Sequence, residues 1–269
     1  MCILTIFTRN ILIFMDSLFF RKVGEGKPLV MLHGVFGSSD NLVSVSRLLA
    51  EVGFCVYLLD ARNHGQSPRS EVFNYDVMAD DLEHFLVEHQ IEKPILVGHS
   101  MGGKVVMNYA MKYTNFEKLV VVDIAPKFYP VHHDHIIQGL LAIDMNKITS
   151  RKEAELIFEK YVSSFDERQF ILKNIYRTQE GGFDWRINVP VLAREIYQIG
   201  GELMNPKVVD VPILFMAGGD SSYIQPSDHA SILQIFPAAS FVTIEGANHW
   251  VHAQKPKEFV HSIQTFVQS

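Results

Sequence analysis

The sequence has little cysteine, and this scarcity narrows the classes of protein to which it can belong. Cys2 and Cys55 are the only cysteines among 269 residues. At most one bridge can therefore form, which excludes a small secreted domain held together by several disulfides. Cys55 lies within an apolar run, where a free thiol packs as a small hydrophobic side chain. This use of cysteine favours a cytoplasmic protein.

Positive charge is also scarce. The chain has 24 lysines and arginines against 30 aspartates and glutamates, which gives a net charge of −6, and it contains no basic cluster. Because a nucleic-acid partner or an anionic lipid surface requires such a cluster, we expect neither. The hydrophobic content of 48% and the charged content of 20% are ordinary for a globular protein. The length allows one large domain or a domain with an insertion.

Long apolar runs are missing as well. The most apolar stretch, residues 3–14, is interrupted by Arg9 and Asn10 and falls short of the roughly 20 residues that span a bilayer. It also lacks the leading positive charge and the small-residue cleavage site of a signal peptide. We therefore expect no membrane span. Residues 1–16 form an apolar extension, which is either an added strand or docked arm, or the product of an upstream start codon with the working protein beginning at Met15.

From residue 28 onward, strand-like and helix-like stretches alternate, which indicates a parallel sheet covered by helices. The predicted strands are 28–32, 54–59, 95–97, 119–122, 212–217 and 240–244. The predicted helices are 41–51, 75–89, 104–113, 227–236 and 256–267.

The alternation stops between residues 127 and 206, where the sequence predicts several short helices and no strand. A helical block inserted into such a pattern predicts a lid over the carboxyl edge of the sheet, where ligands bind. The expected organisation is a core of residues 17–126 and 207–269 with a lid of residues 127–206. Apolar lid side chains are expected to cover the site and to favour acyl chains, among them Phe128, Leu140, Leu141, Phe158 and Tyr161.

A serine between two glycines carries the clearest chemical signal. Residues 98–102 read Gly-His-Ser-Met-Gly, a G-x-S-x-G pattern between a predicted strand and a predicted helix. A nucleophile elbow requires this order, because its serine occupies a strained turn that exposes Oγ above the sheet. A glycine-rich turn with a capping serine is the alternative, but the strand and helix on either side favour an elbow. We predict that Ser100 is a nucleophile.

A serine hydroxyl needs a general base, and His249 is the best candidate. It follows a Glu-Gly-Ala-Asn turn between the last predicted strand and the last predicted helix. In hydrolases built on a parallel sheet covered by helices, the nucleophile comes first along the chain and the histidine comes last. His252 is close enough to compete, but His249 comes directly after the turn, where its ring can reach the edge of the sheet.

Two aspartates compete for the role of the acid that orients His249. Asp220 lies in a polar loop after the strand 212–217, where a solvated carboxylate needs no partner. Asp123 directly follows the strand 119–122, so its carboxylate would be desolvated and would require a partner such as the N–H of His249. We predict Asp123, with Asp220 as the alternative.

The oxyanion that forms during acyl transfer needs preorganised donors. The N–H of Met101, directly after the serine, is predicted to be one. The N–H of Val35, in the glycine-containing loop after the first predicted strand, is predicted to be the other. Glycines also suit a plain loop, but two such loops that meet at one sheet edge favour an oxyanion hole.

A histidine-rich tract, His132-His133-Asp134-His135, resembles a metal site. Because adjacent residues do not converge easily on one ion, we expect a solvated segment instead.

Five segments together resemble the YbfF-type small bacterial esterases of the α/β-hydrolase superfamily. They are HGVFGSSDNL (33–42), DARNHGQSP (60–68), GHSMGGKVVM (98–107), VVDIAP (121–126) and NHWVHAQKP (248–256). The resemblance runs from about residue 17 to the C-terminus. It implies the α/β-hydrolase fold, in which helices flank a mostly parallel sheet, and a cofactor-free hydrolase under a helical lid. In these esterases the acid comes from the VVDIAP segment, which here holds Asp123. The extension before Met15 departs from the family pattern.

The sequence thus predicts a serine hydrolase that cleaves a small-molecule carboxylic ester or acyl thioester through an acyl-serine intermediate, without cofactor or metal. Hydrolysis of C–C bonds or perhydrolysis with the same triad is an alternative within the enzymes. A non-catalytic ligand-binding module on the same fold is the alternative from another class, since such modules can retain the serine.

Overall fold

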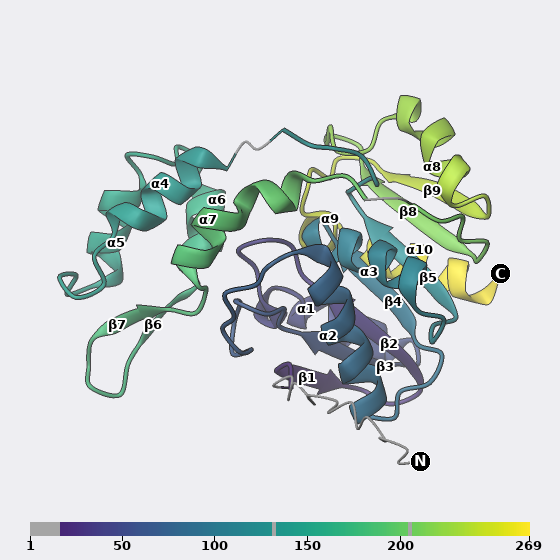
Figure 1. Ribbon diagram of the computed structural model, residues 1–269, viewed down its shortest axis with the longest axis horizontal. Helices are drawn as coiled ribbons and strands as arrows, with labels where there is room; N and C mark the ends of the chain where they lie inside the picture. Colours follow the sequence, from purple (N-terminus) through teal and green to yellow (C-terminus); the bar gives the residue numbers. More distant parts are fainter. Residues whose placement is uncertain (1–16, 131–132, 204–205) are drawn as a thin grey trace, which may run out of the picture.

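A seven-stranded sheet forms the centre of the fold (Figure 1) in a computed structural model that describes residues 17–130, 133–203 and 206–269. The extension predicted for residues 1–16 lies outside this range. The strand order is β1-β3-β2-β4-β5-β8-β9, with β1 antiparallel to β3 and all other neighbours parallel. The strands are β1 (Phe20–Val23), β2 (Lys27–Leu32), β3 (Phe54–Leu59), β4 (Ile95–His99), β5 (Lys118–Val122), β8 (Ile213–Gly218) and β9 (Ala239–Ile244).

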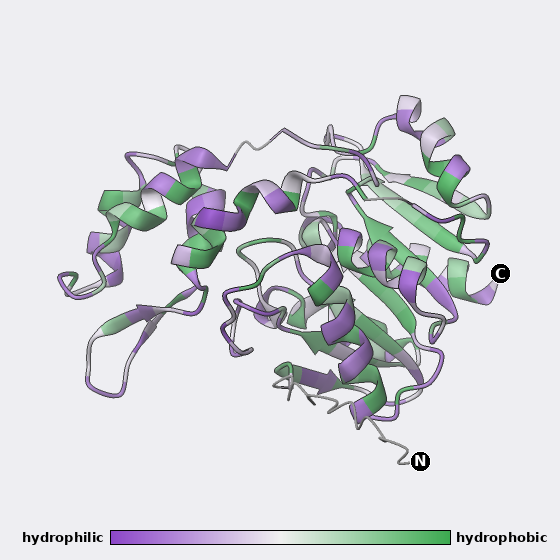
Figure 2. Ribbon diagram, viewed as in Figure 1, coloured by the Kyte–Doolittle hydropathy of each residue, from purple (hydrophilic) through white to green (hydrophobic). Residues whose placement is uncertain are grey.

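Helices cover both faces of this sheet because successive strand side chains point to opposite faces. In β2, Leu29 and Met31 join one core cluster, whereas Val30 and Leu32 join the other. Figure 2 shows β4 and β5 in mostly hydrophobic colours, as expected for strands buried on both faces. The first cluster includes residues of α1 (Val43–Glu51), α9 (Val251–Gln254) and α10 (Pro256–Gln268). The second includes residues of α2 (Tyr75–Glu88), α3 (Met101–Lys112) and α8 (His229–Ile235).

The predicted α/β architecture is confirmed, since each predicted strand and helix of the core is present within a few residues. Two short 3₁₀ helices, Ser39–Asn41 and Pro226–Asp228, precede α1 and α8. The prediction missed β1, an edge strand whose sequence Phe-Arg-Lys-Val carries two charges. An edge strand with one solvated side does not need the continuous apolar run by which buried strands are detected.

Between β5 and β8 the chain forms an insertion, defined here as the elements from α4 to α7, which Figure 1 shows to the left of the sheet. The prediction of no strand in this stretch is wrong, because β6 and β7 pair as a short antiparallel hairpin. Two helices of the insertion begin at serine N-caps. Ser150 accepts a hydrogen bond from the N–H of Glu153, and Ser164 accepts one from the N–H of Glu167. Its elements are α4 (Asp134–Ala142), α5 (Arg151–Phe158), α6 (Phe165–Leu172), β6 (Ile175–Arg177), β7 (Phe183–Trp185) and α7 (Val189–Gly200). No helix within the described ranges is long and apolar enough to cross a membrane.

A buried lysine on α3 attaches both ends of the insertion to the core. Nζ of Lys104 donates hydrogen bonds to the carbonyl oxygens of Lys127, at 3.0 Å, and Gly200, at 3.3 Å, and also to that of Gly201. The ring of Tyr129 lies 4.9 Å from the same nitrogen. Burial lowers the pKa of Lys104 to about 7, although the negative charge of Glu202 partly opposes this shift. The two ends of the insertion therefore meet on the helix that follows Ser100.

The connections diverge at the centre of the sheet. From β2 the chain passes through α1 to β3 on one side, and from β3 it passes through α2 to β4 on the other side of β2. The loops after β2 and β4 therefore separate at the carboxyl edge and leave a crevice between them, the usual ligand site of such sheets.

Candidate active site

Ser100 occupies the sharp turn between β4 and α3. Its backbone has φ 53° and ψ −116°, a conformation that costs a non-glycine residue free energy, and its N–H donates to the carbonyl oxygen of Val122 at 2.9 Å. A Cβ on Gly102 would lie 2.5 Å from the carbonyl oxygen of Leu32, and a Cβ on Gly98 would overlap the backbone of Gly102. The glycines on either side are thus required by close backbone packing, as an elbow demands.

Asp123 contacts the imidazole of His249. Its Oδ2 lies 2.8 Å from Nδ1 of His249 and accepts a hydrogen bond from Oγ of Ser221 at 2.5 Å, while its Oδ1 accepts one from the N–H of Gly218 at 3.1 Å. The carboxylate is wholly buried, so its charge depends on these partners. A proton on Nδ1 leaves Nε2 as the free base of the ring.

The alternative acid, Asp220, does not reach His249 through any hydrogen bond or ion pair of the described residues. It is exposed, and its backbone N–H donates to the carbonyl oxygen of Ala247 at 2.8 Å. The structure brings together Asp123 and His249, as the sequence analysis predicted.

His249 is held in place by contacts to its ring and to its backbone. The ring of Tyr223 stacks on it with centroids 4.0 Å apart and planes at 21°. The carbonyl oxygen of His249 accepts a hydrogen bond from Nε2 of His99 at 2.8 Å. The competing histidine, His252, is buried against the His99 ring, and burial lowers its pKa to about 4. His252 is therefore a core residue outside the pocket.

The loop after β2 is held by His33. Its Nε2 accepts a hydrogen bond from the N–H of Ala61 at 3.0 Å, so its Nδ1 carries the proton and donates to the carbonyl oxygen of Gly34 at 2.7 Å. Burial lowers the pKa of His33 to about 4, which keeps this ring neutral. In a trans peptide the N–H points opposite to the preceding carbonyl, so this bond also fixes the direction of the Val35 N–H.

Two backbone amides next to Ser100 are available as donors. Within the described residues, the N–H groups of Val35 and Met101 donate no hydrogen bond that the structure gives. Both residues line hollows around Ser100. The loop approaches the serine closely, since a Cβ on Gly34 would lie 3.2 Å from Cβ of Ser100. The two donors predicted for an oxyanion are therefore adjacent to the serine and not used elsewhere.

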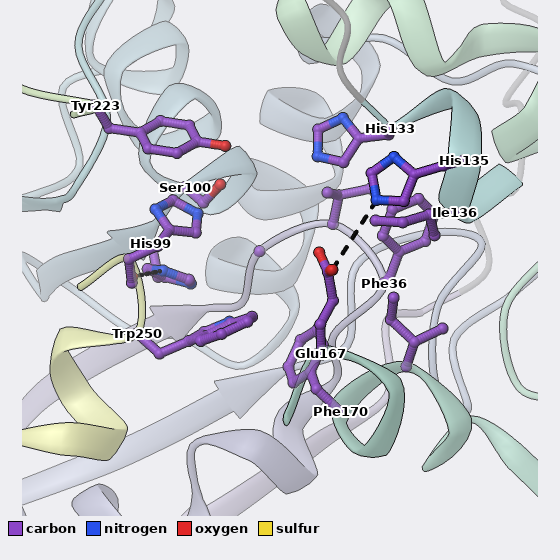
Figure 3. Close-up of a pocket in the computed structure, with 14 residues that line it drawn as sticks. Phe36, His99, Ser100, His133, His135, Ile136, Glu167, Phe170, Tyr223 and Trp250 are labelled. Carbon is purple, nitrogen blue, oxygen red and sulfur yellow. Dashed lines mark hydrogen bonds and ion pairs between the residues drawn. The ribbon is translucent and has the colours of Figure 1, made fainter. Parts of the chain in front are cut away.

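A pocket of about 240 Å³ opens over Ser100 (Figure 3). The core contributes Gly34, Val35, Phe36, His99, Ser100, Tyr223, His249 and Trp250 to its wall, and the insertion contributes His133, His135, Ile136, Glu167, Phe170 and Ile171. The wall is mainly apolar, as predicted, but the residues named for it are wrong. Phe128, Leu141 and Tyr161 are exposed, at 59%, 58% and 38%, and Leu140 and Phe158 are buried in the hydrophobic core. Amphipathic helices offer a polar and an apolar face, and here α4 and α6 turn a partly polar face to the pocket.

Part of the histidine-rich tract also reaches the pocket. His133 and His135 line it, whereas His132 lies outside the described residues. Within the described ranges, no three His, Cys, Asp or Glu side chains are placed to hold a metal ion.

Four residues of the site were not identified from the sequence. Ser221 belongs to the polar loop around Asp220, which the sequence analysis considered only for that aspartate. His99 occupies a variable position of the G-x-S-x-G pattern, and Tyr223 and Glu167 belong to no motif. Only the fold places these three residues around Ser100.

Comparison with known proteins identifies the family of this chain. A model of the α/β hydrolase fold matches residues 27–141. Over 91% of this chain and 80% of the other, the sequence is 41% identical to the sn-1-specific diacylglycerol lipase of Danio rerio. It is 39% identical to esterase YbfF of Escherichia coli over 90% of this chain and 94% of that protein.

Among solved structures, a marine microorganism esterase superimposes with a TM-score of 0.90 at 41% identity, covering 93% of this chain and 99% of that one. The resemblance to YbfF-type esterases is thereby confirmed. The chain belongs to the α/β-hydrolase family, in the group of esterases and lipases that includes esterase YbfF.

Proposed function

We propose that this protein is a serine hydrolase that cleaves carboxylic esters or acyl thioesters, with Ser100 as nucleophile, His249 as general base and Asp123 as the acid that orients it. The observation that carries the proposal is the contact of 2.8 Å between the buried Asp123 carboxylate and Nδ1 of His249, beside a strained serine. Its relatives named as esterases and as a diacylglycerol lipase support ester bonds as the target.

In the proposed reaction, Oγ of Ser100 attacks the acyl carbon while Nε2 of His249 takes the hydroxyl proton. The N–H groups of Val35 and Met101 stabilise the negative oxygen of the tetrahedral intermediate. When the intermediate collapses, His249 returns the proton to the departing alcohol or thiol, and an acyl-serine remains. Water then attacks the acyl carbon while His249 takes a proton from it. When the second tetrahedral intermediate collapses, His249 returns this proton to Oγ, so that the acid is released and Ser100 is regenerated.

We further propose that residues 127–206 act as a lid on a core of residues 17–126 and 207–269. Side chains of α4 and α6 form the outer wall of the pocket, and both ends of the insertion are attached at Lys104. A mainly apolar pocket of about 240 Å³ supports small, largely apolar esters as substrates.

Labelling with a fluorophosphonate probe tests the proposal. The wild-type protein should react covalently and hydrolyse p-nitrophenyl esters, and Ser100→Ala should do neither, with a loss of about 10⁴-fold or more. Labelling that persists in Ser100→Ala would place the nucleophile elsewhere. A folded wild-type protein that neither reacts nor turns over any ester would favour the non-catalytic binding module.

A further inference from the structure

The wall of the pocket that faces Ser100 carries a carboxylate that the proposed reaction does not use. Glu167 lies in the first turn of α6, and Figure 3 shows its carboxylate directed into the pocket, between Trp250 and His135. Its backbone N–H is bound by the N-cap Ser164, but its side chain does not return to the cap as in a capping box. The side chain is 29% exposed, and its ion-pair contact is His135 Nε2 at 4.0 Å, longer than a hydrogen bond.

The negative charge of Glu167 reaches the residues around the serine. Burial and, to a smaller extent, the negative charges of Asp123 and Glu167 together raise the pKa of Tyr223 to about 12. Among the described residues that line the pocket, Glu167 is the only carboxylate, and none is a lysine or an arginine.

Aromatic rings surround the same space. Phe36, Phe170, Tyr223 and Trp250 line the pocket, and Phe170 packs against Trp250 with centroids 5.6 Å apart. A carboxylate beside several ring faces is the usual chemistry of a site for an organic cation, because both attract positive charge. The same carboxylate repels a carboxylate on a ligand.

Taking the proposed esterase function as its basis, we propose that Glu167 is a specificity-determining residue that selects esters carrying a positively charged group and disfavours esters carrying a carboxylate. The charged group belongs to the alcohol or the acyl part, whichever lies toward α6 when the acyl carbon is at Ser100. Glu167 contacts the substrate in this proposal and takes no part in proton transfer.

The test compares esters of equal shape and different charge by pH-stat at about pH 8, where ordinary histidines are neutral. The first pair is choline butyrate and its isostere with carbon in place of the quaternary nitrogen. The second pair places the same groups at the end of the acyl part of a methyl ester. Each pair has an analogue of matched length that ends in a carboxylate.

In one of the two series, Glu167→Gln should lower the ratio of kcat/KM for the cationic over the neutral ester by about tenfold, and raise the ratio for the anionic ester. A merely structural role of Glu167 would not move the two ratios in opposite directions. Asp166→Asn is the matched control, since it removes a charge from the same helical turn at an exposed position outside the pocket, and should change neither ratio.

Unchanged ratios in both series, with the neutral esters still hydrolysed, would overturn the role of Glu167 and leave the proposed function intact. Failure of the wild-type protein to hydrolyse the neutral esters in a Ser100-dependent manner would instead contradict the proposed function itself.

Discussion

Oδ2 of Asp123 lies 2.8 Å from Nδ1 of His249, although 126 positions separate the two residues in the chain. Asp123 has φ 50°, a left-handed conformation that asparagine also tolerates. Asp123→Asn should therefore fold normally but favour the wrong tautomer of His249, with a loss of turnover of about 10⁴-fold.

Asp220→Asn is the matched control for this substitution. It removes the same charge from an exposed loop position, so its turnover should remain close to that of the wild type. Both variants are compared by kcat on protein whose fold is verified by circular dichroism. A larger loss in Asp220→Asn than in Asp123→Asn would transfer the orienting role to Asp220.

The backbone of Ser100 predicts a difference in stability between two inactive variants. At φ 53° and ψ −116° alanine keeps the strain of serine, whereas glycine adopts this conformation readily. Ser100→Gly should therefore be more stable than Ser100→Ala by about 1 kcal/mol, because relief of strain exceeds the entropy that glycine adds to the unfolded chain. Urea unfolding of both variants measures this, and a less stable Ser100→Gly would show that the turn is not strained.

The lysine between the two ends of the insertion predicts a local change in dynamics. Lys104→Met removes the donors to the carbonyl oxygens of Lys127 and Gly200, and unpaired buried carbonyls cost about 1–3 kcal/mol each. Amide hydrogens near both ends of the insertion should exchange faster in this variant. Lys112→Met, on the same helix but in a surface pair with Asp80, should leave exchange there unchanged. Equal exchange in both variants would contradict the attachment.

Buried neutral histidines predict lower stability in acid. Burial lowers the pKa of His252 to about 4, below the ordinary value of 6.5, so between these values the unfolded chain binds a proton that the folded chain does not. The free energy of unfolding should thus fall as the pH falls from 6.5 to 4, with a contribution from this residue of up to about 1.4 kcal/mol per pH unit. His33 and His64, with pKa values lowered to about 4 and about 3 by burial, act in the same direction.

His252→Leu should reduce this pH slope by about one proton, whereas His261→Leu, at an exposed position, should not. The loss of hydrogen bonding is small, because Nδ1 of His252 has no partner within the described residues. Urea unfolding at a series of pH values gives the slopes. Equal slopes for His252→Leu and the wild type would mean that His252 is protonated in the folded state.

The sheet and the positions of Ser100, Asp123 and His249 at its edge were predictable, because local sequence patterns encode them. Strands buried on both faces are continuous apolar runs, and in a parallel sheet the residues after their carboxyl ends must meet at one edge. Ser100 and Asp123 follow two such runs directly. The desolvation expected for Asp123, together with the resemblance to esterases whose acid lies in the same segment, led to the prediction of Asp123 over Asp220, and Asp123 is the one that contacts His249 within the described residues.

The pocket wall was less predictable for a physical reason. Helical periodicity tells which residues share a face, but the choice of face turned toward the pocket depends on packing between α4, α6 and the core. Leu140 and Phe158 were accordingly assigned to the pocket although they lie in the hydrophobic core. Glu167 has the sequence position of an ordinary first-turn acid of a helix, so no local signal distinguishes it.

The hydrogen bond from the N–H of Ser100 to the carbonyl oxygen of Val122 joins the proposed nucleophile to the residue that precedes Asp123. Serine and aspartate thus stand on adjacent strands, β4 and β5, and their separation is set by the sheet ladder. The other donors to the carboxylate come from Gly218, the last residue of β8, and from Ser221 in the loop that follows. Beyond Ser221 the same loop provides the ring of Tyr223, which both lines the pocket and stacks on His249. Exchanging Tyr223 for another aromatic residue therefore offers a way to reshape the pocket while Asp123 and His249 stay in register.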